Sequence, residues 1–98
     1  MASYRLLEKT SFGSVHKCEC CNTFQIFFGN VGLIRDQGQY LTLLKFLEQS
    51  LATGKDVTMF HTEDDDVVML FTKKDIDEML YLLQAGYAIF EAHALLAG

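Results

Sequence analysis

Residues 14–28 read Ser-Val-His-Lys-Cys-Glu-Cys-Cys-Asn-Thr-Phe-Gln-Ile-Phe-Phe. This stretch contains two strand-like runs, Ser14–Thr23 and Phe24–Phe28, on either side of a Cys-Asn-Thr turn, and it predicts a β-hairpin. Gly29-Asn30 then offers a second turn, after which Val31–Ile34 is expected to form a short third strand.

The residues that follow this hairpin predict a helix. Asp36 and Gln39 have the spacing of a capping box, in which each side chain bonds the backbone of the other residue. Gly54 is a typical residue for the position just beyond a helix. The apolar residues between these signals recur at helical spacing and indicate a helix over residues 37–53: Tyr40, Leu43, Leu44, Leu47 and Leu51.

The second half of the chain repeats the order of hairpin and helix. Asp56–Thr62 and Asp66–Thr72 flank the acidic turn Glu63-Asp64-Asp65 and predict a second hairpin. Thr72 and Asp75 then cap a second helix. The predicted fold is α+β in the order ββ(β)αββα, with both hairpins in one antiparallel sheet and both helices on one face of it. With 98 residues, we expect one domain, residues 1–98.

The second helix has two apolar stripes. One is expected to cover the sheet and contains Ile76, Met79, Leu80, Leu83, Tyr87, Phe90 and Ala94. The other has the spacing of a seam between helices and contains Leu82, Ala85, Ile89, Ala92 and Leu96. The second stripe can pack against the first helix, where Leu41 and Phe46 could receive it, or against a second copy of the chain. We predict a homodimer through this stripe, because so small a domain has little else to cover it.

Composition limits the classes of partner. The formal charge is −5, and the eight basic residues are scattered, which argues against nucleic acid and against a polybasic membrane contact. The first 13 residues lack the apolar run of a secretory signal, so a cytoplasmic protein is expected. In that compartment the three cysteines are better interpreted as reduced thiols or metal ligands than as a disulfide framework.

The cysteine-rich turn is where chemistry could reside. Cys18 and Cys21 form a C-x₂-C pair, half of a structural zinc site. The missing ligands could be His16, Cys20 or His61 of the same chain, or the equivalent cysteine pair of a second copy, which would give a Cys₄ site. Two other interpretations remain: thiols that pack as small apolar residues, and a redox or nucleophilic thiol. The sequence has no evident catalytic constellation, so a non-enzymatic, self-associating interaction or regulatory domain is expected. A zinc-binding or thiol-based regulator is the alternative.

A family resemblance rests on the same region. The stretch His-Lys-Cys-Glu-Cys-Cys at residues 16–21, followed by Phe-Gln-Ile at 24–26 and Phe-Gly-Asn-Val at 28–31, resembles a family of small bacterial proteins classed as a domain of unknown function. Cys18 and Cys21 look like the C-x-x-C pair of that family, and Cys20 is an additional thiol beside it. The resemblance implies a bacterial cytoplasmic origin and no particular chemistry.

Overall fold

The computed structural model of the chain describes residues 3–54, 56–61 and 68–97. Its elements, in chain order, are β1 (Tyr4–Lys9), β2 (Gly13–Cys18), β3 (Thr23–Phe28), β4 (Val31–Asp36), α1 (Gln37–Thr53), β5 (Val57–His61), β6 (Val68–Thr72) and α2 (Lys73–Ala97). The first four strands form an antiparallel sheet in the order β1-β2-β3-β4, and β5 and β6 form a separate two-stranded sheet. The α+β class is confirmed, with the order ββββαββα.

The prediction of one shared sheet is wrong. Helix α1 lies between the two sets of strands in the chain, and the β5–β6 pair packs against the helices instead of extending the first sheet. The rings of Phe46 on α1 and Phe60 on β5 lie 4.8 Å apart. Phe71 on β6 is fully buried in the common core. The apolar inner face of the hairpin is therefore covered by side chains of the helical layer. The predicted turn at Glu63-Asp64-Asp65 lies outside the described residues.

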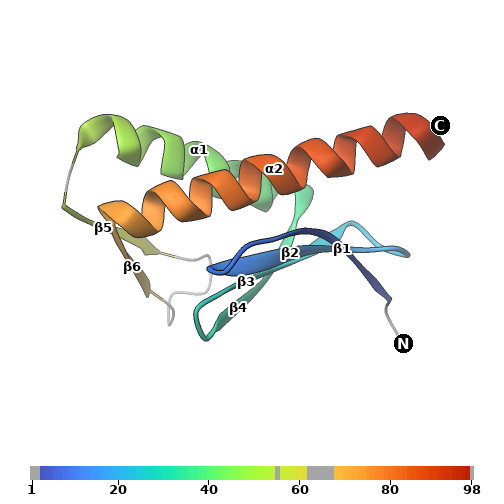
Figure 1. Cartoon of the computed structure of the whole chain (residues 1–98), viewed down its shortest axis with the longest axis horizontal. Coiled ribbons are helices and arrows are strands. Elements are labelled where there is room, and N and C mark those ends of the chain that lie inside the picture. The colour runs from blue at the N-terminus through green and yellow to red at the C-terminus, as the bar shows by residue number, and fades with distance from the viewer. Residues whose placement is uncertain (1–2, 55, 62–67, 98) are drawn as a thin grey trace.

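Both helices cover the same face of the four-stranded sheet, and α2 crosses over the sheet beside α1 (Figure 1). One hydrophobic core joins the sheet, the hairpin and the helices, and its fully buried members include Val15, Phe24, Ile26, Tyr40, Leu43, Leu47, Phe71, Ile76, Met79 and Leu83. In the described part of the chain, no element lies over the opposite face of the sheet, which exposes Leu6, Phe27 and Ile34. The two layers of described elements thus bury mainly one face of the sheet.

Strand β1 was not predicted from the sequence. Its register against β2 shifts between Leu6 and Glu8, so the inward and outward alternation that identifies a strand is broken there. The turn after β1 has a local signal that indicates a turn, because the Thr10 hydroxyl accepts hydrogen bonds from the backbone N–H groups of Phe12 and Gly13.

Both predicted helix starts are confirmed. The Asp36 carboxylate accepts from the Gln39 N–H at 2.8 Å, and the Gln39 side chain accepts from the Asp36 N–H at 3.0 Å. At α2, the Asp75 carboxylate accepts from the Thr72 N–H at 2.9 Å. Helix α1 ends at Thr53, and the capping residue that follows, Gly54, has a left-handed φ of 67°. The short strand predicted over residues 31–34 is also confirmed. It is β4 in the structure and extends to Asp36.

The two stripes of α2 have different surroundings along the helix. Leu82 is fully buried within the chain, so it is not available for the predicted dimer seam. Ala85 is half-buried, whereas Ile89, Ala92 and Leu96 are exposed. In the described part of the chain, α2 is the one helix long and apolar enough to cross a membrane, judged by length and composition. The burial of its first half is typical of a core helix.

Candidate functional site

The three cysteines come together at the turn between β2 and β3. Cys18 ends β2 and is fully buried, whereas Cys20 and Cys21 lie in the turn and are exposed. The three sulfur atoms lie within 4.8 Å of one another, and those of Cys18 and Cys20 are 3.6 Å apart. The turn therefore gathers three soft ligands within the reach of a single ion.

Cys18 and Cys21 are joined as a disulfide, and Cys20 is a free thiol. The sequence favoured reduced thiols or metal ligands over a disulfide. The structure differs because the tight turn brings the Cα atoms of Cys18 and Cys21 to 5.5 Å, which is a usual separation for bonded cysteines.

Lys17 stabilises this turn. Its ammonium group donates hydrogen bonds to the carbonyl oxygens of Cys18 at 2.7 Å and Cys21 at 2.6 Å. The same group lies 5.6 Å from the ring centroid of Phe24 and 5.8 Å from that of Phe90, at cation–π distance. Two further contacts hold the turn: the Glu19 N–H donates to the Ser3 carbonyl at 2.9 Å, and the Cys21 sulfur lies 3.0 Å from the Thr23 hydroxyl. The cysteine turn is thus held at both of its ends.

The predicted histidine ligands do not join the cysteines. Among the described residues, the cluster that could share an ion contains neither His16 nor His61. The His16 ring is engaged on the open face of the sheet, with Nε2 3.0 Å from the Ser14 hydroxyl and a T-shaped contact with the Phe27 ring. Burial lowers the pKa of His16 from its usual value. Of the five candidate ligands, the structure brings together Cys18, Cys20 and Cys21.

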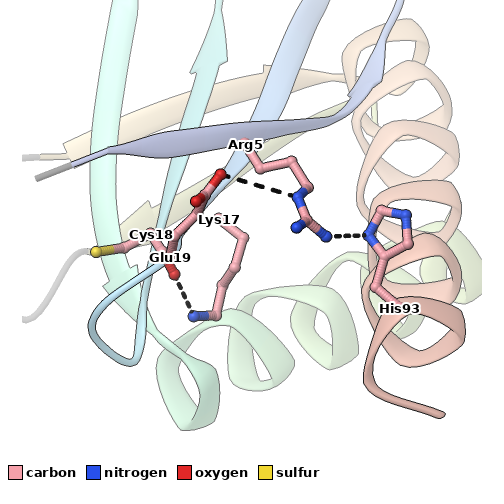
Figure 2. A network of polar contacts seen from close by, with 5 residues as sticks. All are labelled: Arg5, Lys17, Cys18, Glu19 and His93. Carbon is pink, nitrogen blue, oxygen red and sulfur yellow. Dashed lines mark hydrogen bonds and ion pairs between the residues drawn. The ribbon is translucent and has the colours of Figure 1, made fainter. Parts of the chain in front are cut away.

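An open cavity of about 330 Å³ lies beside the turn, between strands β1 and β2 and the last turns of α2. Figure 2 shows the polar groups around it: Arg5, Lys17, Glu19 and His93. The Arg5 guanidinium donates to Nδ1 of His93 at 3.1 Å, and its Nε lies 3.9 Å from the Glu19 carboxylate. The sequence did not predict this cluster.

The Cys18 sulfur points away from the Arg5 and His93 side chains (Figure 2). Cys18 is nevertheless one of the residues that line the cavity. The cavity and the cysteine turn also share Lys17, whose ammonium group bonds the cysteine turn, and Glu19, which belongs to that turn.

Comparisons with protein-family models, with curated proteins and with solved structures find no match to this chain.

Proposed function

We propose that the chain is a small thiol-based regulatory domain whose cysteine turn holds a soft metal ion such as Zn²⁺ when reduced and closes a disulfide when oxidised. The observation that carries this proposal is the clustering of the Cys18, Cys20 and Cys21 sulfur atoms within 4.8 Å. Ligands of a tetrahedral zinc–thiolate site stand about 3.8 Å apart, given a Zn–S distance near 2.3 Å. The 3.6 Å between the Cys18 and Cys20 sulfur atoms is close to that spacing.

The charge of the turn supports a metal ion. Three thiolates and one divalent cation carry a net charge of −1. The Lys17 ammonium, bonded to the turn carbonyls, offsets this charge, and the Glu19 carboxylate of the same turn is paired with Arg5. Three protein ligands leave a fourth position open, which water, an external thiol or a residue of a second copy can occupy. Thiolates select soft metal ions over magnesium or calcium.

The oxidised state follows from the same geometry. The exposed Cys21 thiolate attacks a low-molecular-weight disulfide, forms a mixed disulfide and releases one thiol. The Cys18 thiolate then attacks the Cys21 sulfur, closes the Cys18–Cys21 bond and releases the second thiol. The external disulfide thus accepts two electrons, and the turn loses two of its three metal ligands. Oxidation and metal binding therefore exclude each other.

Elemental analysis of the reduced full chain, purified without a histidine tag or chelator, tests the proposal. We expect about one zinc ion per chain, released when oxidised glutathione consumes two thiols. About half a zinc ion per chain would place the metal between two copies and contradict a self-contained site. A reduced chain that takes up no zinc would overturn the proposal.

Two variants separate the ligands from their neighbours. Replacing Cys20→Ser is expected to weaken zinc affinity at least about tenfold while leaving the Cys18–Cys21 disulfide able to form. His16→Gln is the matched control, because His16 lies outside the sulfur cluster and should leave the affinity unchanged. Equal zinc binding by the Cys20→Ser variant and the unmodified chain would mean that Cys20 is not a ligand and that only Cys18 and Cys21 bind the ion.

Self-association is the second candidate function, and the exposed apolar surface favours it. The end of α2 exposes Ile89, Leu95 and Leu96, the last two at 84% and 86%. The outer face of the β5–β6 hairpin is also apolar and exposes Val57, Met59, Val68 and Leu70. Apolar surface of this extent on a small domain is typical of an interaction site. We propose a homodimer in which the exposed end of α2 takes part.

A further inference from the structure

The cavity beside the cysteine turn contains positive charge on the face of the sheet that packs against the helices. Arg5 and Lys17 are paired across β1 and β2. Lys17 lies two residues from the fully buried Val15, so both side chains point to the helical side of the sheet. There the Arg5 guanidinium meets His93 of α2, which lies 88 positions away in the sequence. Two cations and a histidine therefore converge where an apolar row would ordinarily continue the core.

Charge compensation in this cavity is incomplete. Among the described residues that line it, Glu19 is the only acid. Its carboxylate stands 3.9 Å from Arg5 Nε, and both side chains are about half exposed, at 51% and 50%. An exposed ion pair of this length is weak. The Arg5 guanidinium also donates to His93 Nδ1, which leaves further N–H donors of its five for a ligand.

We propose that this cavity binds a small carboxylate with a short apolar body. The planar guanidinium of Arg5 matches a carboxylate, and the Lys17 ammonium adds a second positive charge. Apart from the polar groups named above, the wall consists of Leu7, Cys18, Phe90 and Ala94 and is largely apolar. A volume of about 330 Å³ is at the small end of the range for ligand sites.

Glu19 marks the position of the ligand carboxylate. Its own carboxylate already faces Arg5 from the rim, as Figure 2 shows, and its exposure lets the side chain turn out into solvent. A bound carboxylate would replace this long contact with a shorter one. Cys18 also lines the cavity, but its sulfur points away from the Arg5 and His93 side chains (Figure 2).

Titration of the full chain with sodium butyrate at low ionic strength, followed by two-dimensional NMR of the backbone amides, tests this proposal. We expect saturable shifts centred on Arg5, Lys17 and His93. Butyramide, the neutral molecule of the same shape, should bind at least about tenfold more weakly, since it lacks the charge that Arg5 and Lys17 recognise.

Three variants locate the site. Arg5→Gln should weaken butyrate binding about tenfold or more, whereas Lys9→Gln removes the same charge from the exposed end of β1 and should leave binding unchanged. Glu19→Gln should tighten binding about twofold to fivefold, because the competing carboxylate is gone. Absence of saturable shifts, equal binding of butyramide, or unaltered binding by the Arg5→Gln variant would overturn the proposal. Binding of inorganic phosphate without butyrate would also overturn it.

Discussion

The two halves of helix α2 have similar apolar sequences and opposite surroundings. In the first half, the exposed fraction is no more than 1% at Ile76, Met79 and Leu82. In the second half, Leu95 and Leu96 are more than four-fifths exposed. The red C-terminal end of α2 also diverges from the sheet in Figure 1. Apolar periodicity therefore identifies the faces of a helix, but the length of the surface beneath it decides which of them is covered.

The two halves of α2 are also expected to contribute differently to folding and to association. Side chains in the first half of α2 contribute to the core of the single chain. Those at the end of α2 have few neighbours in the chain, so they contribute little to folding and are free to contribute to an interface. Substitutions in the two halves should therefore affect different measurements.

The largest expected effect is the loss of stability when a leucine in the buried half is shortened. Leu82→Ala should lower the free energy of unfolding by about 2–5 kcal/mol, because it removes buried methyl groups and leaves a cavity. Leu95→Ala makes the same chemical change at an exposed position and should alter it by no more than about 0.5 kcal/mol. Urea unfolding at protein concentrations where the chain is monomeric measures both. Similar losses for the two variants would contradict the division of α2.

The next effect concerns association through the exposed half. Leu96→Glu places a charge in the proposed dimer interface and removes the burial of a leucine, worth about 1.5–3 kcal/mol. The dimer dissociation constant should therefore rise about tenfold or more. Gln84→Glu, which adds the same charge on the exposed side of the buried half, should leave it unchanged. Sedimentation velocity over a range of concentrations measures the constant, and a wild-type chain that remains monomeric throughout would exclude the interface.

Local signals explain which parts of the fold could be predicted from the sequence. The capping boxes of Asp36 with Gln39 and of Thr72 with Asp75 each involve residues three apart, so their spacing alone indicates a helix start. Helix α1 was predicted with its bounds for this reason. The partition of the six described strands into two sheets depends on packing between distant segments, and no short pattern encodes it. Strand β1 was missed because the bulge near Leu7 interrupts its alternation.

The candidate sites also differ in how far the sequence could predict them. The three cysteines are neighbours in the sequence, so their clustering could be predicted. His16 could not be excluded in advance, because its engagement by Ser14 and Phe27 depends on the register between β2 and β3. The cavity could not be predicted at all, since the contact of Arg5 with His93 joins the two ends of the chain.

The smallest expected effect is at the hydrogen bond that joins the buried half of α2 to α1. The Tyr40 hydroxyl donates to the Leu83 carbonyl at 2.6 Å inside the core. Tyr40→Phe removes this bond and should lower the free energy of unfolding by about 1 kcal/mol. Tyr87→Phe is the matched control: its hydroxyl accepts from the Gln37 side chain at 2.9 Å, in a half-buried position where water can replace the partner, and it should cost less.

Alkaline pH provides a second test of Tyr40. Burial, and secondarily the charge of Tyr87, raise the pKa of Tyr40 above its usual value, so the fold favours the neutral phenol. In the unfolded chain this phenol ionises near its ordinary pKa of about 10. The contribution of Tyr40 to stability is therefore fully present below that pH and is lost as the pH rises above it. The urea midpoint of the wild-type chain should fall more steeply between about pH 9 and pH 11 than that of the Tyr40→Phe variant. Equal slopes would mean that the Tyr40 phenol has the same pKa in the folded and the unfolded chain, and would contradict its burial in the core.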